Sequence, residues 1–280
     1  MSTKKRPGGH PARAGEAQDA RAARQAKAAA LREREKARER SRRVLLITVA
    51  VVVVLAIVAT VVVLVQRQRE DTARTAAAST AGPAAPNAVA ADGGIKLPGT
   101  PAAGAPTVDI WLDYQCPVCK RFEDFGGQAY VDLAAQGKAE VVVHTLTFLD
   151  ENLGTAPSSQ LAAEGAAAAD AQGKFVQYTQ TLYANQPAEG EGYTADSLQA
   201  LAEQVDGLDV AAWRKALDDH VYAAYVERVQ AQMEPKGVQG TPTVRVTSPS
   251  GTVTEVPAAQ LLTASAPQDL AAAVQKATGA

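Results

Sequence analysis

The two cysteines of this 280-residue chain lie three positions apart, in the segment Cys116-Pro117-Val118-Cys119. Two thiols at this spacing can form and release a disulfide, and they can also supply two ligands to a zinc or copper ion. A metal site would need further ligands such as His144 and His220, which are far apart in sequence and fit no familiar spacing. A dithiol/disulfide redox pair is therefore the favoured chemistry, and no metal is expected.

The residues around the pair predict how its thiols are positioned. The β-prone run Thr107 to Tyr114 precedes Cys116, and Pro117 suits the first position of a helix, where no backbone N–H is needed. Cys116 should then lie at a helix N-terminus, where unpaired N–H groups and the helix dipole stabilise a thiolate and lower its pKa. Cys119 lies one turn further into the helix, so it should be shielded and able to attack only its neighbour.

The rest of the segment 106–280 predicts an α/β domain with helices inserted between strands. A strand is expected at 139–148, whose nearly continuous apolar start is typical of a sheet buried on both faces. Thr194 and Asp209 are expected to cap helices, and a Gly126-Gly127 pair could interrupt the first helix. The further predicted elements are helices at 158–172, 174–185, 195–205, 210–219 and up to about 234, strands at 243–247 and 252–256, and a closing helix at 258–276.

Four segments of the chain resemble those of a known family, in the same order. They are Asp113–Phe122 around the cysteines, Gln172–Phe175, Gly207–Val210 and Gly237–Thr243. Over about residues 106–277, the chain resembles the DsbA-like thiol:disulfide oxidoreductases of the thioredoxin superfamily, and among them the membrane-anchored members of actinobacteria. The resemblance implies a thioredoxin-like fold with an inserted helical subdomain at about 155–236.

The resemblance also implies roles for individual residues. In the family, the proline that matches Pro242 is cis and faces the cysteines, and the backbone at Thr241 pairs with an extended substrate peptide. Pro117 and Val118 would form the active-site dipeptide. The sequence has no flavin or haem motif, so no cofactor is expected. The resemblance implies reoxidation by a quinone-linked integral membrane partner, such as a vitamin-K-epoxide-reductase homologue.

Two positions depart from the best-known members of the family. Ile110 replaces a buried acid six residues before the first cysteine, so the proton acceptor for Cys119 must lie elsewhere, with Asp113 or water as alternatives. The dipeptide between the cysteines lacks the histidine of the strongest oxidase, which leaves the size of the oxidising potential open. His144 and His220 are expected to serve packing or to lie on the surface.

The run from Val44 to Val65 contains 22 residues and no charge. As a helix it would span about 33 Å, enough for a hydrocarbon core of roughly 30 Å, so we expect a single transmembrane helix. A cleaved signal peptide is the alternative, but its apolar region should be only about 7–15 residues long. The flank before the run is the more basic one, which predicts a cytoplasmic N-terminus and an outer location for residues 66–280. Thiols pair and exchange in such an oxidising compartment.

Charge divides the chain into two opposite parts. Residues 1–43 carry a net charge of +9 and residues 66–280 a net charge of −11. The basic tail should be attracted to anionic membrane lipids, whereas the acidic outer part argues against nucleic acid as a partner. Residues 66–105 are rich in Ala, Thr, Gly and Pro, so they are expected to form a flexible linker to the domain at 106–280.

These features together predict a membrane-anchored enzyme that introduces disulfides into exported polypeptides with free thiols, through Cys116 and Cys119. The same dithiol could instead serve a disulfide reductase or isomerase that receives electrons across the membrane. A copper or zinc metallochaperone and a peptide-binding module are alternatives from other classes. The reduction potential distinguishes the oxidase from the reductase or isomerase, and metal titration of the reduced protein tests the metallochaperone.

Overall fold

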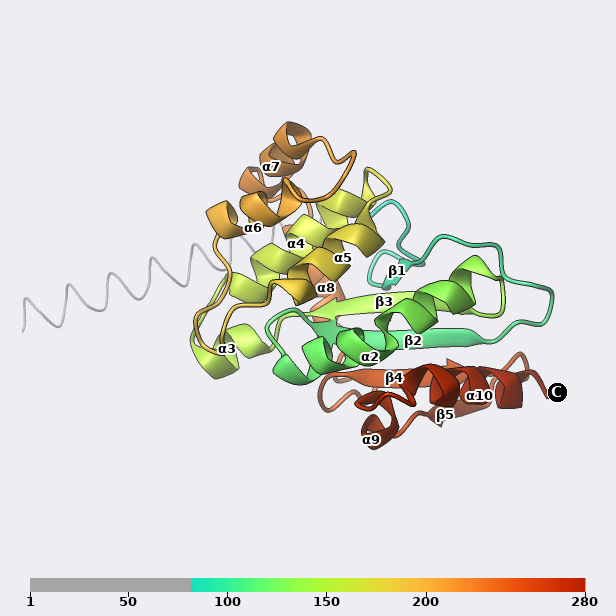
Figure 1. Ribbon diagram of the computed structural model, residues 1–280. Helices are drawn as coiled ribbons and strands as arrows, with labels where there is room; N and C mark the ends of the chain where they lie inside the picture. The colour runs from blue at the N-terminus through green and yellow to red at the C-terminus, as the bar shows by residue number, and fades with distance from the viewer. Residues whose placement is uncertain (1–81, 280) are drawn as a thin grey trace, which may run out of the picture. The chain divides into compact units, whose positions relative to one another are not determined.

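The computed structural model describes residues 82–279, whose arrangement is shown in Figure 1. The predicted basic tail 1–43, the predicted membrane helix 44–65 and the first part of the predicted linker lie outside the described residues. Among residues 82–279, no helix is both long and apolar enough to cross a lipid bilayer.

A five-stranded mixed sheet forms the centre of the described domain. Its strands are β1 (Ile95–Lys96), β2 (Thr107–Asp113), β3 (Glu140–Leu146), β4 (Thr243–Thr247) and β5 (Val253–Glu255), in the spatial order β1-β3-β2-β4-β5. β2 runs parallel to β3, and the other three pairings are antiparallel. β2 is therefore central, and its Ile110 lies opposite Val143 of β3 and Val244 of β4. The strands predicted from sequence are confirmed to within a few residues.

Two helices, α2 (Pro117–Ala135) and α10 (Ala266–Thr278), pack together over the sheet (Figure 1). Phe122 of α2 and Leu270 of α10 are fully buried, and they share one hydrophobic core with Ile110 of β2. Because α2 joins β2 to the parallel strand β3, its first residues must lie at the end of the sheet where β2 stops. This connection places the start of α2 next to Asp113, the last residue of β2.

Two predicted helix boundaries differ from the structure. The interruption expected at Gly126-Gly127 does not occur, because Gly126 packs against α10: a Cβ added there would lie 3.5 Å from the Cβ of Ala266. Tertiary contact therefore outweighs the low helix propensity of glycine. The closing helix predicted at 258–276 is divided into α9 (Ala258–Leu261) and α10, since Pro267 begins a new helix.

A helical layer lies between β3 and β4 in the chain, where an insertion at about 155–236 was predicted. Its helices are α3 (Leu149–Leu153), α4 (Ser158–Asp170), α5 (Phe175–Ala184), α6 (Ala195–Ala202), α7 (Val210–Asp218) and α8 (Ala223–Ala231). The two predicted caps are confirmed: Thr194 accepts a hydrogen bond from the Ser197 N–H at 3.1 Å, and Asp209 accepts one from the Ala212 N–H at 3.0 Å. Figure 1 shows α4 to α7 gathered on the β1–β3 side of the sheet.

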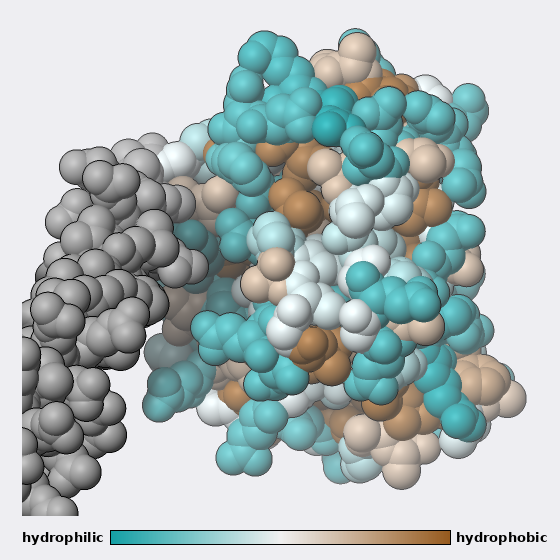
Figure 2. Space-filling view, turned by 90° about the vertical axis from the view of Figure 1, so that its left-hand side faces the viewer, coloured by the Kyte–Doolittle hydropathy of each residue, from teal (hydrophilic) through white to brown (hydrophobic). Residues whose placement is uncertain are grey.

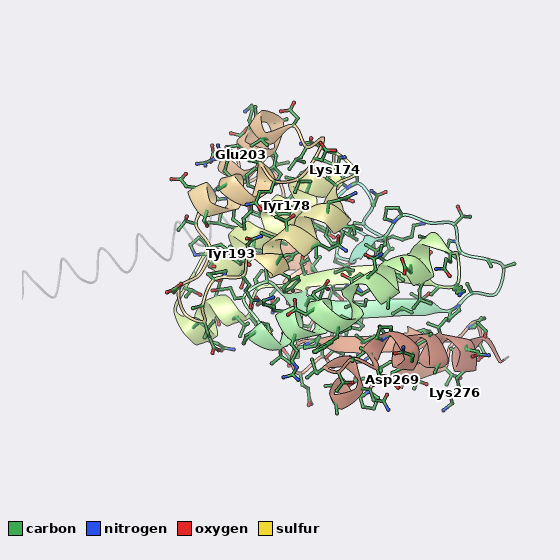
Figure 3. The ribbon with its side chains drawn as sticks, viewed as in Figure 1. Lys174, Tyr178, Tyr193, Glu203, Asp269 and Lys276 are labelled. Carbon is green, nitrogen blue, oxygen red and sulfur yellow. The ribbon has the colours of Figure 1, made fainter. Side chains whose placement is uncertain are left out.

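Buried aromatic side chains hold this helical layer together. Trp213 of α7 is fully buried and donates a hydrogen bond from Nε1 to the Gly165 carbonyl of α4 at 2.7 Å. Tyr178 of α5 contacts the same indole, with ring centroids 5.5 Å apart. Tyr193, labelled with Tyr178 in Figure 3, precedes α6 and donates its hydroxyl hydrogen to the Leu182 carbonyl at 3.0 Å. The insertion therefore has a closely packed aromatic interior of its own.

Residues 82–105, predicted as part of the flexible linker 66–105, instead pack on the domain. β1 pairs antiparallel with β3, and its Ile95 is 1 % exposed. Asn87 donates from its backbone N–H and its side-chain amide to the Asp170 carboxylate of α4, each at 2.9 Å. The domain thus begins before the predicted boundary at residue 106, because the outer edge of β3 is covered by this short strand.

Candidate active site

Cys116 is the N-cap residue of α2, with an extended backbone at φ −73° and ψ 116°. Its sulfur accepts a hydrogen bond from the Cys119 N–H at 3.4 Å, and its own N–H donates to the Asp113 carbonyl at 3.0 Å. The first N–H groups of α2 have no partner within the helix, so an anionic sulfur at this position satisfies one of them and faces the positive end of the helix dipole. The predicted position of the first thiol at a helix N-terminus is confirmed.

The two thiols have opposite electrostatic environments. A hydrogen bond from the Cys119 thiol is the main cause that lowers the pKa of Cys116 to about 6, and burial works against this shift. The Thr241 side chain and the N–H groups of Val118 and Cys119 lower it further. Burial raises the pKa of Cys119 well above its usual range, and its hydrogen bond to Cys116 adds to this effect. Cys116 can therefore be a thiolate at neutral pH while Cys119 keeps its proton.

Exposure separates the two thiols in the same way. Cys116 is 6 % exposed and Cys119 is fully buried. Pro117 occupies the first turn of α2, and Val118 is 41 % exposed beside the first thiol. Figure 2 shows the domain from the side where β2 ends and α2 begins, and hydrophilic residues there surround smaller apolar areas.

The loop before β4 brings Thr241 and Pro242 to the cysteines. The Thr241–Pro242 peptide bond is cis, as the resemblance implied. The Cys116 thiol donates a hydrogen bond to the Thr241 carbonyl at 3.5 Å. The Thr241 side chain also faces the cysteines and lowers the pKa of both thiols. Residues 125 positions apart in sequence thus form one site.

Asp113 holds the loop that leads to Cys116. Its buried carboxylate accepts hydrogen bonds from the Gln115 N–H at 2.9 Å, the Ser159 hydroxyl at 2.6 Å and the Leu149 N–H at 3.2 Å. Burial raises the pKa of Asp113 to about 6, against the effect of these hydrogen bonds. The carboxylate is directed at α3 and α4, so we assign Asp113 to positioning the loop. Ile110, at the position of the missing acid, is fully buried in the core.

Gln115 and Gln186 are site residues that the sequence did not indicate. The Gln115 side chain donates to Asp150 at 2.8 Å and to the Ser159 hydroxyl at 2.7 Å, which ties the loop to α3 and α4. Gln186, which follows α5, donates to the carbonyls of Tyr114 at 2.8 Å and Cys116 at 3.0 Å. Their partners are far away in sequence, and no local pattern marks them. Together they fix the backbone on both sides of the first thiol.

The two histidines weighed as metal ligands have other partners. The His144 ring stacks on Trp111, with centroids 4.7 Å apart, and its Nε2 lies 2.9 Å from an Asp109 carboxylate oxygen. His220 lies 3.0 Å from the Glu164 carboxylate in the helical layer. Within residues 82–279, no three His, Cys, Asp or Glu side chains come together in a way that could hold a metal ion.

A family model described as thioredoxin matches residues 96–250, which is more than half of the chain. The chain belongs to the thioredoxin family. The matched span starts in β1 and includes both cysteines and the Thr241–Pro242 loop. It also begins before residue 106, in agreement with the packed segment at 82–105. A search of curated proteins finds no match.

Solved structures of DsbA-type proteins share this fold. The MdbA protein of Actinomyces oris, a thiol-disulfide oxidoreductase, superposes with a TM-score of 0.55 at 20 % identity, covering 71 % of this chain and 91 % of that one. Oxidised DsbA of Mycobacterium tuberculosis gives a TM-score of 0.53 at 22 % identity, with 67 % and 93 % covered. MdbA of Corynebacterium diphtheriae gives 0.51 at 18 %, with 63 % and 90 % covered. The chain is therefore a thioredoxin-family member with a DsbA-like fold.

Proposed function

We propose that this chain is a membrane-anchored, extracytoplasmic thiol:disulfide oxidoreductase that introduces disulfides into exported proteins. The observation that carries the proposal is the pair itself: Cys116 at the start of α2 with a pKa lowered to about 6, next to the buried Cys119. A thiol with a low pKa is a good leaving group, so a disulfide that contains it is readily given away. The names of the MdbA and DsbA structures support the same class of enzyme.

The reaction follows from the different exposure of the two sulfurs. A substrate thiolate attacks Cys116 in the Cys116–Cys119 disulfide, forming a mixed disulfide and releasing the Cys119 sulfur, which takes up a proton because its pKa is high. A second thiolate of the substrate then attacks the substrate sulfur of the mixed disulfide and expels Cys116 as a stabilised thiolate. The substrate loses two electrons and two thiol protons and gains a disulfide. The enzyme gains the two electrons and one proton, as the Cys119 thiol and the Cys116 thiolate, and the other proton goes to solvent.

Substrate peptides are proposed to pair with the backbone at Thr241. This residue borders Cys116, and a peptide that lies along it in an extended form would gain main-chain hydrogen bonds irrespective of its sequence. The partners are accordingly exported polypeptides with free thiols. Since each cycle leaves the enzyme reduced, a partner must remove two electrons, and we propose a quinone-linked integral membrane protein for this step.

The proposed location rests on the sequence before residue 82. The uncharged run 44–65 would anchor the chain, and the basic segment 1–43 would stay on the cytoplasmic side with anionic lipids. Protease added to intact spheroplasts should therefore remove residues 66–280, whereas a cytoplasmic control protein stays whole. Protection of the domain in intact spheroplasts, with digestion only after lysis, would overturn the orientation.

The direction of the reaction is proposed to be oxidation, with a reductase or isomerase as the alternative. Equilibration of the purified protein with defined glutathione mixtures gives the reduction potential of the Cys116–Cys119 pair. A strongly oxidising pair lies near about −120 mV and a thioredoxin-like reductant near about −270 mV. We expect a reduction potential closer to about −120 mV, because the lowered pKa of Cys116 stabilises the reduced form. A reduction potential near about −270 mV would assign the chain to the reductases.

A further inference from the structure

A row of side chains crosses the sheet on the face that points away from the core beneath α2 and α10. The strand register places Arg245 of β4 between Asp109 of β2 and Glu255 of β5. Trp111 shares this face, because side chains two residues apart on a strand point the same way. The Arg245 guanidinium lies over the Trp111 ring, 5.3 Å from its centroid, and the other partner of this ring is the stacked imidazole of His144.

The Arg245 side chain joins this row to the loop before β4. Its Nε donates to the Glu255 carboxylate at 2.9 Å, while Nη1 donates to the Lys236 carbonyl at 2.6 Å and Nη2 to the Gly237 carbonyl at 2.9 Å. The guanidinium is planar and rigid, so it fixes these acceptors relative to one another. Its side chain is only 18 % exposed. Arg245 therefore fastens two adjacent backbone carbonyls of the loop to the sheet.

The fastened loop is the one that carries Thr241 to the first thiol. Val238 is buried in a small cluster with Trp111 and Leu146, which is separate from the main core. At the other end of the loop, the Thr243 hydroxyl donates to the Gly240 carbonyl at 2.7 Å. Only a few residues separate Thr241 from the Lys236 and Gly237 carbonyls that Arg245 holds. A displacement of these carbonyls would therefore move the backbone of Thr241 away from Cys116.

We propose that Arg245 is a positioning residue for disulfide exchange, which holds the loop 236–242 so that Thr241 stays against Cys116. The proposal rests on the proposed function for its consequence in catalysis. This role gives a reason for the three hydrogen bonds that the largely buried guanidinium of Arg245 donates. Lysine could keep the positive charge but could not donate to Glu255 and to both carbonyls in a planar fork.

The test compares Arg245→Gln and Arg245→Lys with the wild-type full-length protein and with Arg214→Gln as a matched control. Arg214 makes two ion pairs in the helical layer, with Asp196 and Asp218, and touches no part of the loop. Two readouts are measured: the pH midpoint of Cys116 alkylation, and the ratio of disulfide transfer rates to a reduced peptide and to glutathione. Neither readout moves when a substitution only lowers the melting temperature.

Arg245→Gln should raise the alkylation midpoint of Cys116 by up to about one pH unit, because the Thr241 side chain, which lowers the pKa of this thiol, would no longer be held beside it. The transfer rate to the peptide should fall several-fold more than the rate to glutathione, which needs little backbone pairing. Arg245→Lys should show the same changes to a smaller extent, and Arg214→Gln should show neither.

Unchanged midpoints and unchanged rate ratios in both Arg245 variants would show that this residue only stabilises the fold, and the proposal would be wrong. If Arg245→Gln does not fold, the lysine variant decides, because it keeps the charge. If the wild-type protein transfers no disulfide to the peptide, the proposed function fails, but the alkylation midpoints still test whether Arg245 positions the loop.

Discussion

Replacing Cys116 with alanine should abolish disulfide transfer to a reduced peptide, whereas replacing Cys119 with alanine should trap the enzyme in mixed disulfides. The reason is the exposure of the two sulfurs: Cys116 reaches the surface and Cys119 is fully buried. Without Cys116 no accessible sulfur is left, so transfer should fall to the rate of the buffer alone. Without Cys119 the Cys116 thiolate still attacks substrate disulfides, and the mixed disulfide can then be released only by a substrate thiol, so it should accumulate.

Both outcomes can be read from non-reducing gels of cells that express the tagged full-length variants, together with transfer assays on the purified proteins. Ser250→Ala, in the exposed turn between β4 and β5, serves as a control that keeps both thiols and the Thr241 loop. Mixed disulfides in the Cys116→Ala variant, or none in the Cys119→Ala variant, would reverse the assigned roles. Equal adducts in both would remove the basis for a nucleophile and a resolving thiol.

The thiol pair and its helix could be predicted because their signals are local. Pro117 directly after Cys116 marks a helix start, and the apolar run before them marks a strand, so the element boundary falls at the first thiol. Thr241 and Pro242 were placed at the site by resemblance, since no physical pattern in the sequence links them to residues 125 positions away. The structure brings the two cysteines together with Thr241 and Pro242.

The buried polar contacts behind the thiols could not be predicted. The sequence offers Asp113 as a proton acceptor but does not show its partners Ser159 and Leu149, which lie 46 and 36 positions away and are brought near by the packing of α3 and α4. Gln186 reaches Cys116 across 70 positions for the same reason. A glutamine after a helix or an aspartate at the end of a strand is usually solvated, and the roles of Gln186 and Asp113 depend on tertiary structure alone.

The composition of residues 66–105 predicts a flexible linker, but part of this segment belongs to the packed domain. The segment before residue 106 is rich in small residues and prolines, yet Ile95 and Leu97 are buried in it. A strand of two residues gives no detectable alternation, so only the uncovered edge of β3 explains its place. Short edge strands of this kind are set by the sheet that they join.

The second large effect concerns the reactivity of the reduced enzyme. With a pKa of about 6, Cys116 should be about 90 % thiolate at pH 7, whereas a free thiol with a pKa near 8.5 is only about 3 % thiolate. Since only the thiolate is alkylated, the fraction that can react is roughly thirtyfold higher than that of an unperturbed thiol. Cys119, whose pKa is raised well above its usual range by burial, should stay unreactive over the same pH range.

Disulfide exchange depends on Cys116 as an activated thiolate, held at the start of α2 beside a buried, protonated Cys119. These two protonation states are measured most directly by iodoacetamide alkylation of the reduced full-length protein from about pH 4 to about pH 9, with the label located by mass-spectrometric fragmentation. We expect a single titration at Cys116 with a midpoint near pH 6, and labelling of Cys119 only after denaturation. A midpoint for Cys116 at about 8.5 or above, or equal labelling of both cysteines in the folded protein, would contradict this expectation.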